Sequence, residues 1–164
     1  MYWRVCKVKG NDKVIAALNK TLHEELTALS QYFVHAEMCE NWKYEELAKF
    51  IKKRAIVEMK HAERLIERTL FLDGTVDMVW PSQVKIGNTV KEQLENDLAA
   101  ELGAVKSYND AVKLARAVGD NGTAEVFDAN LRDEEDHTDW LEAQLSLIKD
   151  VGYENYLSTQ VETE

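Results

Sequence analysis

The sequence is poor in the residues that interrupt helices or build covalent frameworks. Its 164 residues include one proline, seven glycines and two cysteines. So little proline and glycine argues against a loop-rich or all-β protein and favours long helices. Cys6 and Cys39 are not in a metal-binding spacing. They offer no disulfide framework, and a reducing cytoplasm is the default expectation.

Long hydrophobic runs and an excess of positive charge are also missing. No apolar stretch reaches about 18 residues, and the first seven residues lack the uninterrupted apolar segment of a secretory signal. The formal net charge of −10 disfavours binding to nucleic acid or to an anionic membrane and favours cations. With 45% hydrophobic residues, the chain can bury a core of its own.

Apolar residues recur at spacings of three and four over four long segments, which is the pattern of packed helices. Asn11 and Thr89 are placed to cap two of these helices at their N-termini, and Gly74 and Gly152 to end two others. We expect helices at about 11–42, 45–73, 89–118 and 123–150, with a short fifth helix at 153–160.

The connections predict how these helices are arranged. Short polar turns join the first pair and the last pair, so each pair forms an antiparallel hairpin. The segment 74–88 joins the two hairpins and, when extended, can span about 50 Å. The second predicted helix is about 43 Å long, so this segment can return the chain to the other end of the bundle. We therefore predict an all-α four-helix bundle with one long crossover. A single domain at 11–164 follows an N-terminal extension, residues 1–10.

A Glu-x-x-His motif occurs twice, and the two copies are 76 residues apart. Glu58 and His61 share one face of the second predicted helix, and Glu134 and His137 share one face of the fourth. A single pair of this kind is common on a solvated polar face. The recurrence at a fixed offset indicates more than a solvated face.

The same offset relates the first predicted helix to the third, so the two halves look like one repeated hairpin. Glu25 corresponds to Glu101, and both occupy inward positions where the pattern demands an apolar residue. A buried, unpaired carboxylate is costly, so a cation is expected beside it. One Glu from each of four helices with a His from two of them is the ligand pattern of di-iron carboxylate bundles.

Charge and donor chemistry favour two iron ions. Four glutamates carry −4 and two divalent ions carry +4, whereas the empty site would hold like charges that raise each other's pKa. Imidazole and carboxylate donors without thiolate suit iron or manganese, and iron can also change oxidation state. Buried salt bridges to Arg54 and Arg68 are the alternative, but they do not explain four inward Glu and two inward His.

Aromatic residues accompany this constellation. Tyr32 and Tyr108 lie two turns beyond the glutamates of their helices, and Trp140 lies one turn after His137. Their spacing fits electron or hydrogen-bond donors to the metals and fits ordinary aromatic core equally well.

A second apolar stripe runs outside the inward faces of the first two predicted helices. It consists of Leu26, Phe33, Ile56, Met59 and Ile66. A helix pair that is apolar on two sides must bury the second side elsewhere, so we expect an oligomer. Met59 offers a sulfur of the kind that binds haem iron, although spacing alone favours ordinary packing.

From Val8 to the C-terminus the chain resembles the bacterioferritin family. The segments that carry the resemblance include Leu18-Asn19-Lys20, Glu25-Leu26-Thr27-Ala28, Gln31-Tyr32-Phe33, Glu58-Met59-Lys60-His61-Ala62 and Leu131-Arg132-Asp133-Glu134-Glu135. The resemblance implies a ferritin-like fold and a hollow 24-subunit shell built from two-fold dimers. Such a shell oxidises Fe²⁺ with O₂ or H₂O₂ and stores it as a ferric mineral.

The resemblance also implies roles for individual residues. It assigns Glu25 and His61 to one iron ion and Glu101 and His137 to the other. Glu58 and Glu134 would bridge the two ions. Met59 matches the family's axial ligand to haem b or a related porphyrin, one from each of two subunits. Tyr32 is a candidate electron donor. A small iron–sulfur ferredoxin is the expected reductant for iron release.

The chain also departs from the family. Lys53 and Val57 stand where an extra iron site is often formed by a His and an Asp, so electron delivery through such a site is not expected. Leu65 replaces a frequent tyrosine. The N-terminus is seven residues longer than usual, and we expect Val8 to be the true initiator.

Two other functions would fit parts of the sequence. A rubrerythrin-like di-iron peroxidase would carry the Cys-x-x-Cys pairs of an electron-transfer module, which the sequence lacks. A haem-carrying structural subunit of a mixed cage would not need the intact set of six ligands. We therefore expect a ferroxidase that stores iron.

Overall fold

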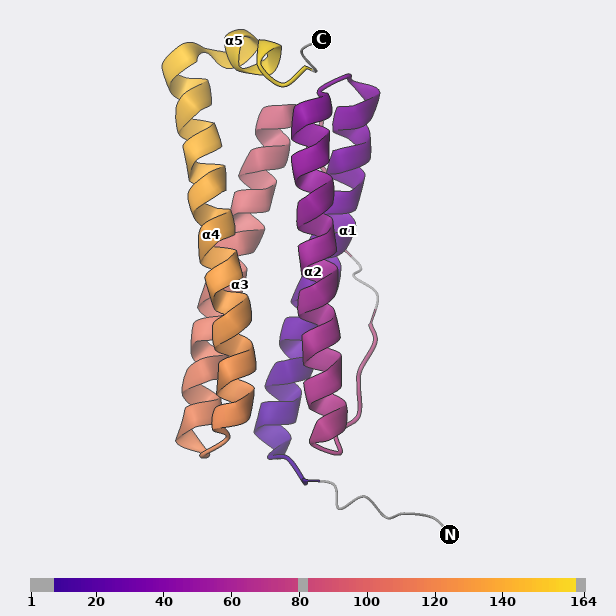
Figure 1. Ribbon diagram of the computed structural model, residues 1–164, viewed down its shortest axis with the longest axis vertical. Coiled ribbons are helices and arrows are strands. Elements are labelled where there is room, and N and C mark those ends of the chain that lie inside the picture. Colours follow the sequence, from indigo (N-terminus) through magenta and orange to yellow (C-terminus); the bar gives the residue numbers. More distant parts are fainter. Residues whose placement is uncertain (1–7, 80–82, 162–164) are drawn as a thin grey trace.

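The computed structural model describes residues 8–79 and 83–161. The described residues form four long helices and one short one: α1 (Asp12–Asn41), α2 (Glu45–Phe71), α3 (Val90–Ala117), α4 (Asn121–Val151) and α5 (Tyr153–Ser158). In Figure 1 the hairpins α1–α2 and α3–α4 lie side by side, and the crossover runs back along the bundle. Consequently α3 is parallel to α2. The predicted four-helix bundle with one long crossover and a short fifth helix is confirmed.

Side-chain caps define where several helices begin. The Asn11 side chain accepts a hydrogen bond from Lys13 N at 2.9 Å, and Thr89 accepts one from Glu92 N at 3.2 Å. Asp120 accepts one from Thr123 N at 3.0 Å. This cap starts α4 at Asn121, two residues earlier than expected.

The end of α2 also differs from the expectation. The helix ends at Phe71, and Asp73, with φ of 57°, adopts the left-handed conformation that was expected of Gly74. Aspartate tolerates this conformation because its short polar side chain can hydrogen-bond locally. The fourth helix does end at glycine, since Gly152 has φ of 87°. The short helix α5 lies across the end of the bundle (Figure 1). Its Tyr156 is completely buried.

The core consists of two apolar clusters with a polar layer between them. One cluster includes Leu18, Leu22 and Phe127, and the other includes Ile51, Leu94 and Leu141. All six predicted metal-ligating residues lie along the helices between these clusters and are at most 2% exposed. The apolar clusters therefore fix the helices on both sides of a charged interior.

A buried polar network attaches the crossover to α1. Asp97 contacts His35 Nδ1 at 3.0 Å and accepts a hydrogen bond from the Gln31 amide at 2.8 Å. The backbone N–H groups of Lys85 and Gly87 donate to Gln31 and His35, respectively. These contacts satisfy polar groups that would otherwise be unpaired in the interior.

The second apolar stripe is narrower than expected. Phe33, Ile56 and Met59 are each about half exposed, at 53%, 49% and 51%. Leu26 is only 7% exposed and packs in the subunit's own core, against which Ile66 also packs. The outward apolar face is therefore centred on the three exposed residues. No helix in the described part of the chain is long and apolar enough to cross a membrane.

Candidate metal centre

Four helices each direct one glutamate into the polar layer. Helical geometry places Glu58 and His61 one turn apart on α2, and the same three-residue spacing places Glu134 beside His137 on α4. Glu25 of α1 and Glu101 of α3 face this group from the other two helices. The structure thus brings all six predicted ligands into one cluster.

The carboxylates gather around His61 on one side. The Nδ1 atom of His61 lies 3.3 Å from Glu25 Oε2, 3.2 Å from Glu58 Oε2 and 2.9 Å from Glu134 Oε1. A single imidazole nitrogen can donate only one proton, so it cannot satisfy three carboxylate oxygens.

The arrangement around His137 repeats this pattern. The Nδ1 atom of His137 lies 3.2 Å from Glu101 Oε1, 3.1 Å from Glu58 Oε1 and 3.1 Å from Glu134 Oε2. Glu58 and Glu134 therefore place one oxygen beside each imidazole, whereas Glu25 and Glu101 each contact one imidazole only. The two rings are 6.2 Å apart and nearly parallel, with an interplanar angle of 22°.

The spacing of these donor atoms fits a pair of divalent ions. Adjacent ligands around a first-row ion, bound at about 2.1 Å, are separated by about 3 Å. That separation matches the 2.9–3.3 Å between each Nδ1 and its carboxylate oxygens. Three of these buried oxygens, Glu58 Oε1 and both of Glu134, have no hydrogen-bond partner in the described residues. Cations would satisfy them.

The electrostatics of the metal-free cluster also favour a bound cation. Burial raises the pKa of Glu58 to about 8 and raises the pKa of Glu25, Glu101 and Glu134 as well. Burial acts against a charge on His61, but its contacts with Glu134, Glu25 and Glu58 outweigh burial and raise its pKa. Protons therefore occupy the cluster when metal does not, and metal binding must displace them.

Two tyrosines contact the outer glutamates in matching positions. The Tyr32 hydroxyl donates to Glu101 Oε1, and the Tyr108 hydroxyl donates to Glu25 Oε1. Both side chains are almost fully buried, and burial raises the pKa of both phenols. Tyr32 and Tyr108 therefore hydrogen-bond to candidate metal ligands in addition to packing in the core.

The other residues singled out by the sequence lie elsewhere. Trp140 stacks on Phe50 with ring centroids 3.8 Å apart, and Arg54 lies over the same Phe50 ring. Arg68 pairs with Asp120 at 2.8 Å. The alternative to a metal site, in which Arg54 and Arg68 form salt bridges with the inward glutamates, is therefore not the arrangement found. Met59 belongs to the outward apolar face.

Sequence reasoning missed a group of polar residues behind the ligands. Asp133 Oδ2 lies 3.0 Å from His61 Nε2, and Arg64 Nη1 lies 3.3 Å from the same oxygen. The sequence signals are that Asp133 immediately precedes Glu134 and lies in one of the segments that carry the resemblance. Adjacent residues on a helix point in different directions, so the helical periodicity that identified Glu134 gave no indication of a role for Asp133.

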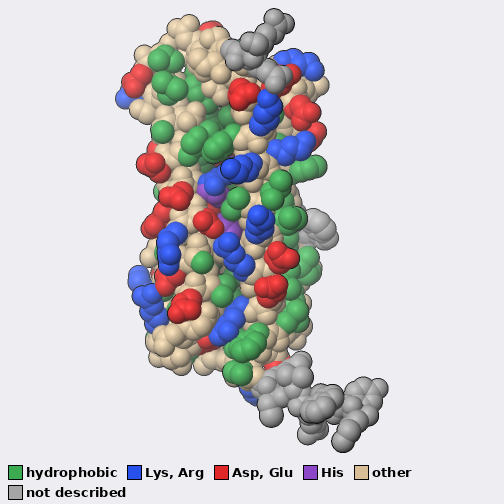
Figure 2. Space-filling view, viewed as in Figure 1, with side chains coloured by type: hydrophobic (Ala, Val, Ile, Leu, Met, Phe, Trp, Pro, Cys, Tyr) green, Lys and Arg blue, Asp and Glu red, His purple; other side chains and the backbone are tan. Residues whose placement is uncertain are grey.

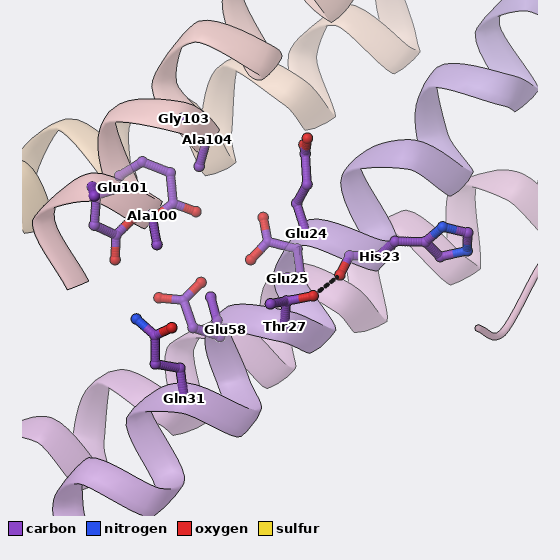
Figure 3. A pocket seen from close by; sticks show the side chains of 13 residues that line it. His23, Glu24, Glu25, Thr27, Gln31, Glu58, Ala100, Glu101, Gly103 and Ala104 are labelled. Atoms are coloured by element: carbon purple, nitrogen blue, oxygen red, sulfur yellow. Dashed lines mark hydrogen bonds between the residues drawn. The ribbon is translucent and has the colours of Figure 1, made fainter. Parts of the chain in front are cut away.

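A pocket leads from the surface to the cluster between α1 and α3. It has a volume of about 350 Å³, and its lining includes Gln31, Gly103 and the glutamates of all four helices. In Figure 3, Glu25, Glu58 and Glu101 point towards the same space from three helices. Figure 2 views the face where α2 and α4 are in front, and side chains of both charges cover it.

Comparisons with known proteins identify the family of this chain. Residues 15–151 match the family described as ferritin-like domain. Bacterioferritin of Brucella melitensis is 41% identical, over 91% of this chain and 92% of its own length. Bacterioferritin of Streptomyces coelicolor is 40% identical, over 94% of this chain and 93% of its own length.

A solved structure gives the same result in three dimensions. Bacterioferritin of Mycobacterium tuberculosis superposes with a TM-score of 0.92 and 36% identity, covering 94% of this chain and 98% of that one. Fold and sequence identity agree over nearly the whole chain. The chain therefore belongs to the bacterioferritin family of ferritin-like proteins.

Proposed function

We propose that this protein is a ferroxidase and iron-storage subunit that oxidises Fe²⁺ at a paired site within each subunit. The observation that carries the proposal is the pair of donor clusters centred on His61 and His137, which share both oxygens of Glu58 and of Glu134. Glu25 completes one position and Glu101 the other. Membership of the bacterioferritin family supports iron as the substrate.

The residues of the site bring two ions together and neutralise them. Glu58 and Glu134 hold both ions, and the terminal Glu and His of each position complete its donor set. Two Fe²⁺ ions supply two electrons, enough to reduce O₂ to hydrogen peroxide or hydrogen peroxide to water. Binding releases the protons that the buried carboxylates retain in the metal-free protein. The pocket between α1 and α3 gives the oxidant access.

The assembly we propose is a shell of 24 subunits built from two-fold dimers. The outward apolar face of Phe33, Ile56 and Met59 supports it, because exposed apolar residues at adjoining positions favour burial against a second copy. Within such a dimer, Met59 of each subunit would offer a sulfur that can bind the iron of haem b or a related porphyrin. A small iron–sulfur ferredoxin would then reduce the stored mineral through the haem.

Replacing one bridging glutamate tests the proposed oxidation site. We expect Glu58→Ala to lose the rapid phase of Fe²⁺ oxidation, because both ions lose a shared donor, while the shell still assembles. Stopped-flow absorbance in the near ultraviolet measures the rate, and size-exclusion chromatography measures assembly. The matched control is Glu63→Ala, an exposed glutamate on the same helix, which should oxidise Fe²⁺ at the unchanged rate. Wild-type kinetics in Glu58→Ala would refute the proposed site.

A further inference from the structure

The two ends of the metal centre are supported differently, although the internal repeat makes their ligands equivalent. His61 Nε2 lies 3.0 Å from Asp133 Oδ2. His137 Nε2 is buried and has no hydrogen-bond partner among the residues that the structure describes. The repeat explains the difference, because the residue 76 positions before Asp133 is Val57, which has no polar side-chain atom.

Arg64 connects the support of His61 to the second terminal ligand on the same side. Its Nη1 lies 3.3 Å from Asp133 Oδ2 and donates to Asn130 Oδ1 at 2.9 Å. The Asn130 amide donates to the Tyr108 hydroxyl at 3.0 Å, and that hydroxyl donates to Glu25. Both terminal ligands of this position are therefore held by one connected set of polar side chains.

The corresponding residues on the other side do not form such a set. Where the second half of the chain has Asn130, the first has Arg54, and the position equivalent to Arg64 is Trp140. Arg54 and Trp140 both pack on the ring of Phe50. In the described part of the chain, Glu101 is therefore supported by Tyr32, while the far nitrogen of His137 has no protein group to support it.

This difference has a direct effect on metal affinity. A carboxylate that accepts the far N–H of a ligating imidazole fixes its tautomer, aims the other nitrogen at the metal and makes that nitrogen more basic. Removing such a carboxylate typically weakens metal binding about 10–100-fold. Asp133 provides this support to His61, whereas Val57 leaves His137 without it.

We infer that the two metal positions are unequal: the Glu25/His61 position binds the more tightly, and the Glu101/His137 position is the more readily exchanged. The inference rests on the proposed paired metal site. Asp133 acts as a positioning residue, since it contacts a ligand rather than the metal. The first ion therefore fills the supported position, and the second completes the pair at the other.

Equilibrium titration of the metal-free protein with Co²⁺ tests the inference without oxidation chemistry. Co²⁺ follows Fe²⁺ directly in the affinity order of divalent ions, and its visible absorption reports each binding step. For the wild type we expect two Co²⁺ per subunit in two steps that differ in affinity by about tenfold or more.

Two substitutions assign the steps to the two positions. Asp133→Ala should weaken the tight step about 10–100-fold and leave the other step unchanged. Val57→Asp places a carboxylate at the position that the repeat relates to Asp133 and should tighten the weak step. Asp136→Ala, which removes an exposed carboxylate on α4, is the matched control and should change neither step.

The outcomes separate this inference from the proposed function. Two Co²⁺ bound with equal affinity, or equal weakening of both steps in Asp133→Ala, would overturn the inequality while preserving the paired site. Fewer than two Co²⁺ per subunit would overturn the paired site as well. If Asp133→Ala fails to fold, Val57→Asp still decides, because an unchanged weak step contradicts the inference.

Discussion

At the scale of the residue, the metal centre depends on side chains that each contact more than one other group. Tyr32 and Tyr108 donate to the two terminal glutamates. Among the residues that the structure describes, only Tyr108 also accepts a hydrogen bond, from the Asn130 amide. A hydrogen bond donated to a phenol oxygen draws electron density from it and makes removal of an electron harder. Tyr32 is therefore the better candidate for an electron donor.

Replacing each tyrosine tests this assignment. We expect Tyr32→Phe to lose most of the tyrosyl radical formed when the Fe²⁺-loaded protein meets O₂, because the oxidisable phenol beside Glu101 is gone. Tyr108→Phe is the control and should retain the radical. Freeze-quenched electron paramagnetic resonance measures the signal. A radical that persists in Tyr32→Phe and disappears in Tyr108→Phe would reverse the assignment.

The six candidate ligands were accessible to sequence reasoning because they break a pattern. Glu25 and Glu101 interrupt apolar positions, and the recurring Glu-x-x-His pairs give the offset that relates the two halves. Asp133 was not predictable in the same way, because its role depends on where the His61 ring points from another helix. Periodicity along one helix does not report contacts of that kind.

At the scale of the element, the polar connections between helices contribute to stability as well as to topology. Asp120 caps α4 through Thr123 N and also accepts a hydrogen bond from Arg68 Nη2 at 2.8 Å, linking the end of α2 to the start of α4. Both partners of this ion pair are less than 20% exposed, so its loss leaves a poorly solvated charge.

Substitution of the two caps measures this contribution. We expect Asp120→Ala to lower the free energy of unfolding by about 2–3 kcal/mol, because a cap and a partly buried ion pair are lost together. Asn11→Ala removes an exposed cap and should cost about 1 kcal/mol. Urea unfolding at fixed protein concentration provides both values. Equal costs for the two variants would show that the Arg68 contact contributes nothing.

Most of the helical architecture was predictable, and its exceptions are local. Apolar periodicity over four segments gave the long helices and their order, because amphipathic packing dominates helix stability. The α2 end was misplaced because Asp73 rather than Gly74 is left-handed. The hydrogen bonds of His35 and Asp97 near the crossover had no periodic signal, since they join segments distant in sequence.

At the scale of the whole molecule, the outward face of α1 and α2 is the surface on which we propose that two subunits meet. Phe33, Ile56 and Met59 are about half exposed in the single chain. Burying them in a two-fold dimer would remove apolar surface from water and bring the two copies of Met59 together. The proposed dimer formation and the proposed haem binding can be tested separately, because only haem binding would need the sulfur of Met59.

A pair of substitutions separates them. We expect Met59→Leu to assemble normally but to lose haem, since leucine keeps the apolar volume and removes the ligand atom. Ile56→Asp should impair assembly, because it introduces a charge that must be buried. Absorbance after reconstitution with haemin measures binding, and size-exclusion chromatography measures assembly. Full haem binding by Met59→Leu would contradict the proposed ligand.

The most direct test of the central claim is the stoichiometry of rapid iron oxidation. Metal-free protein is titrated anaerobically with Fe²⁺, air is admitted, and absorbance in the near ultraviolet is followed. The paired site predicts a fast phase that saturates at two Fe²⁺ per subunit, one for each cluster centred on His61 and His137. Slower phases beyond that point would report mineral growth. Absence of a fast phase, or its saturation at one Fe²⁺ per subunit, would contradict a paired ferroxidase site.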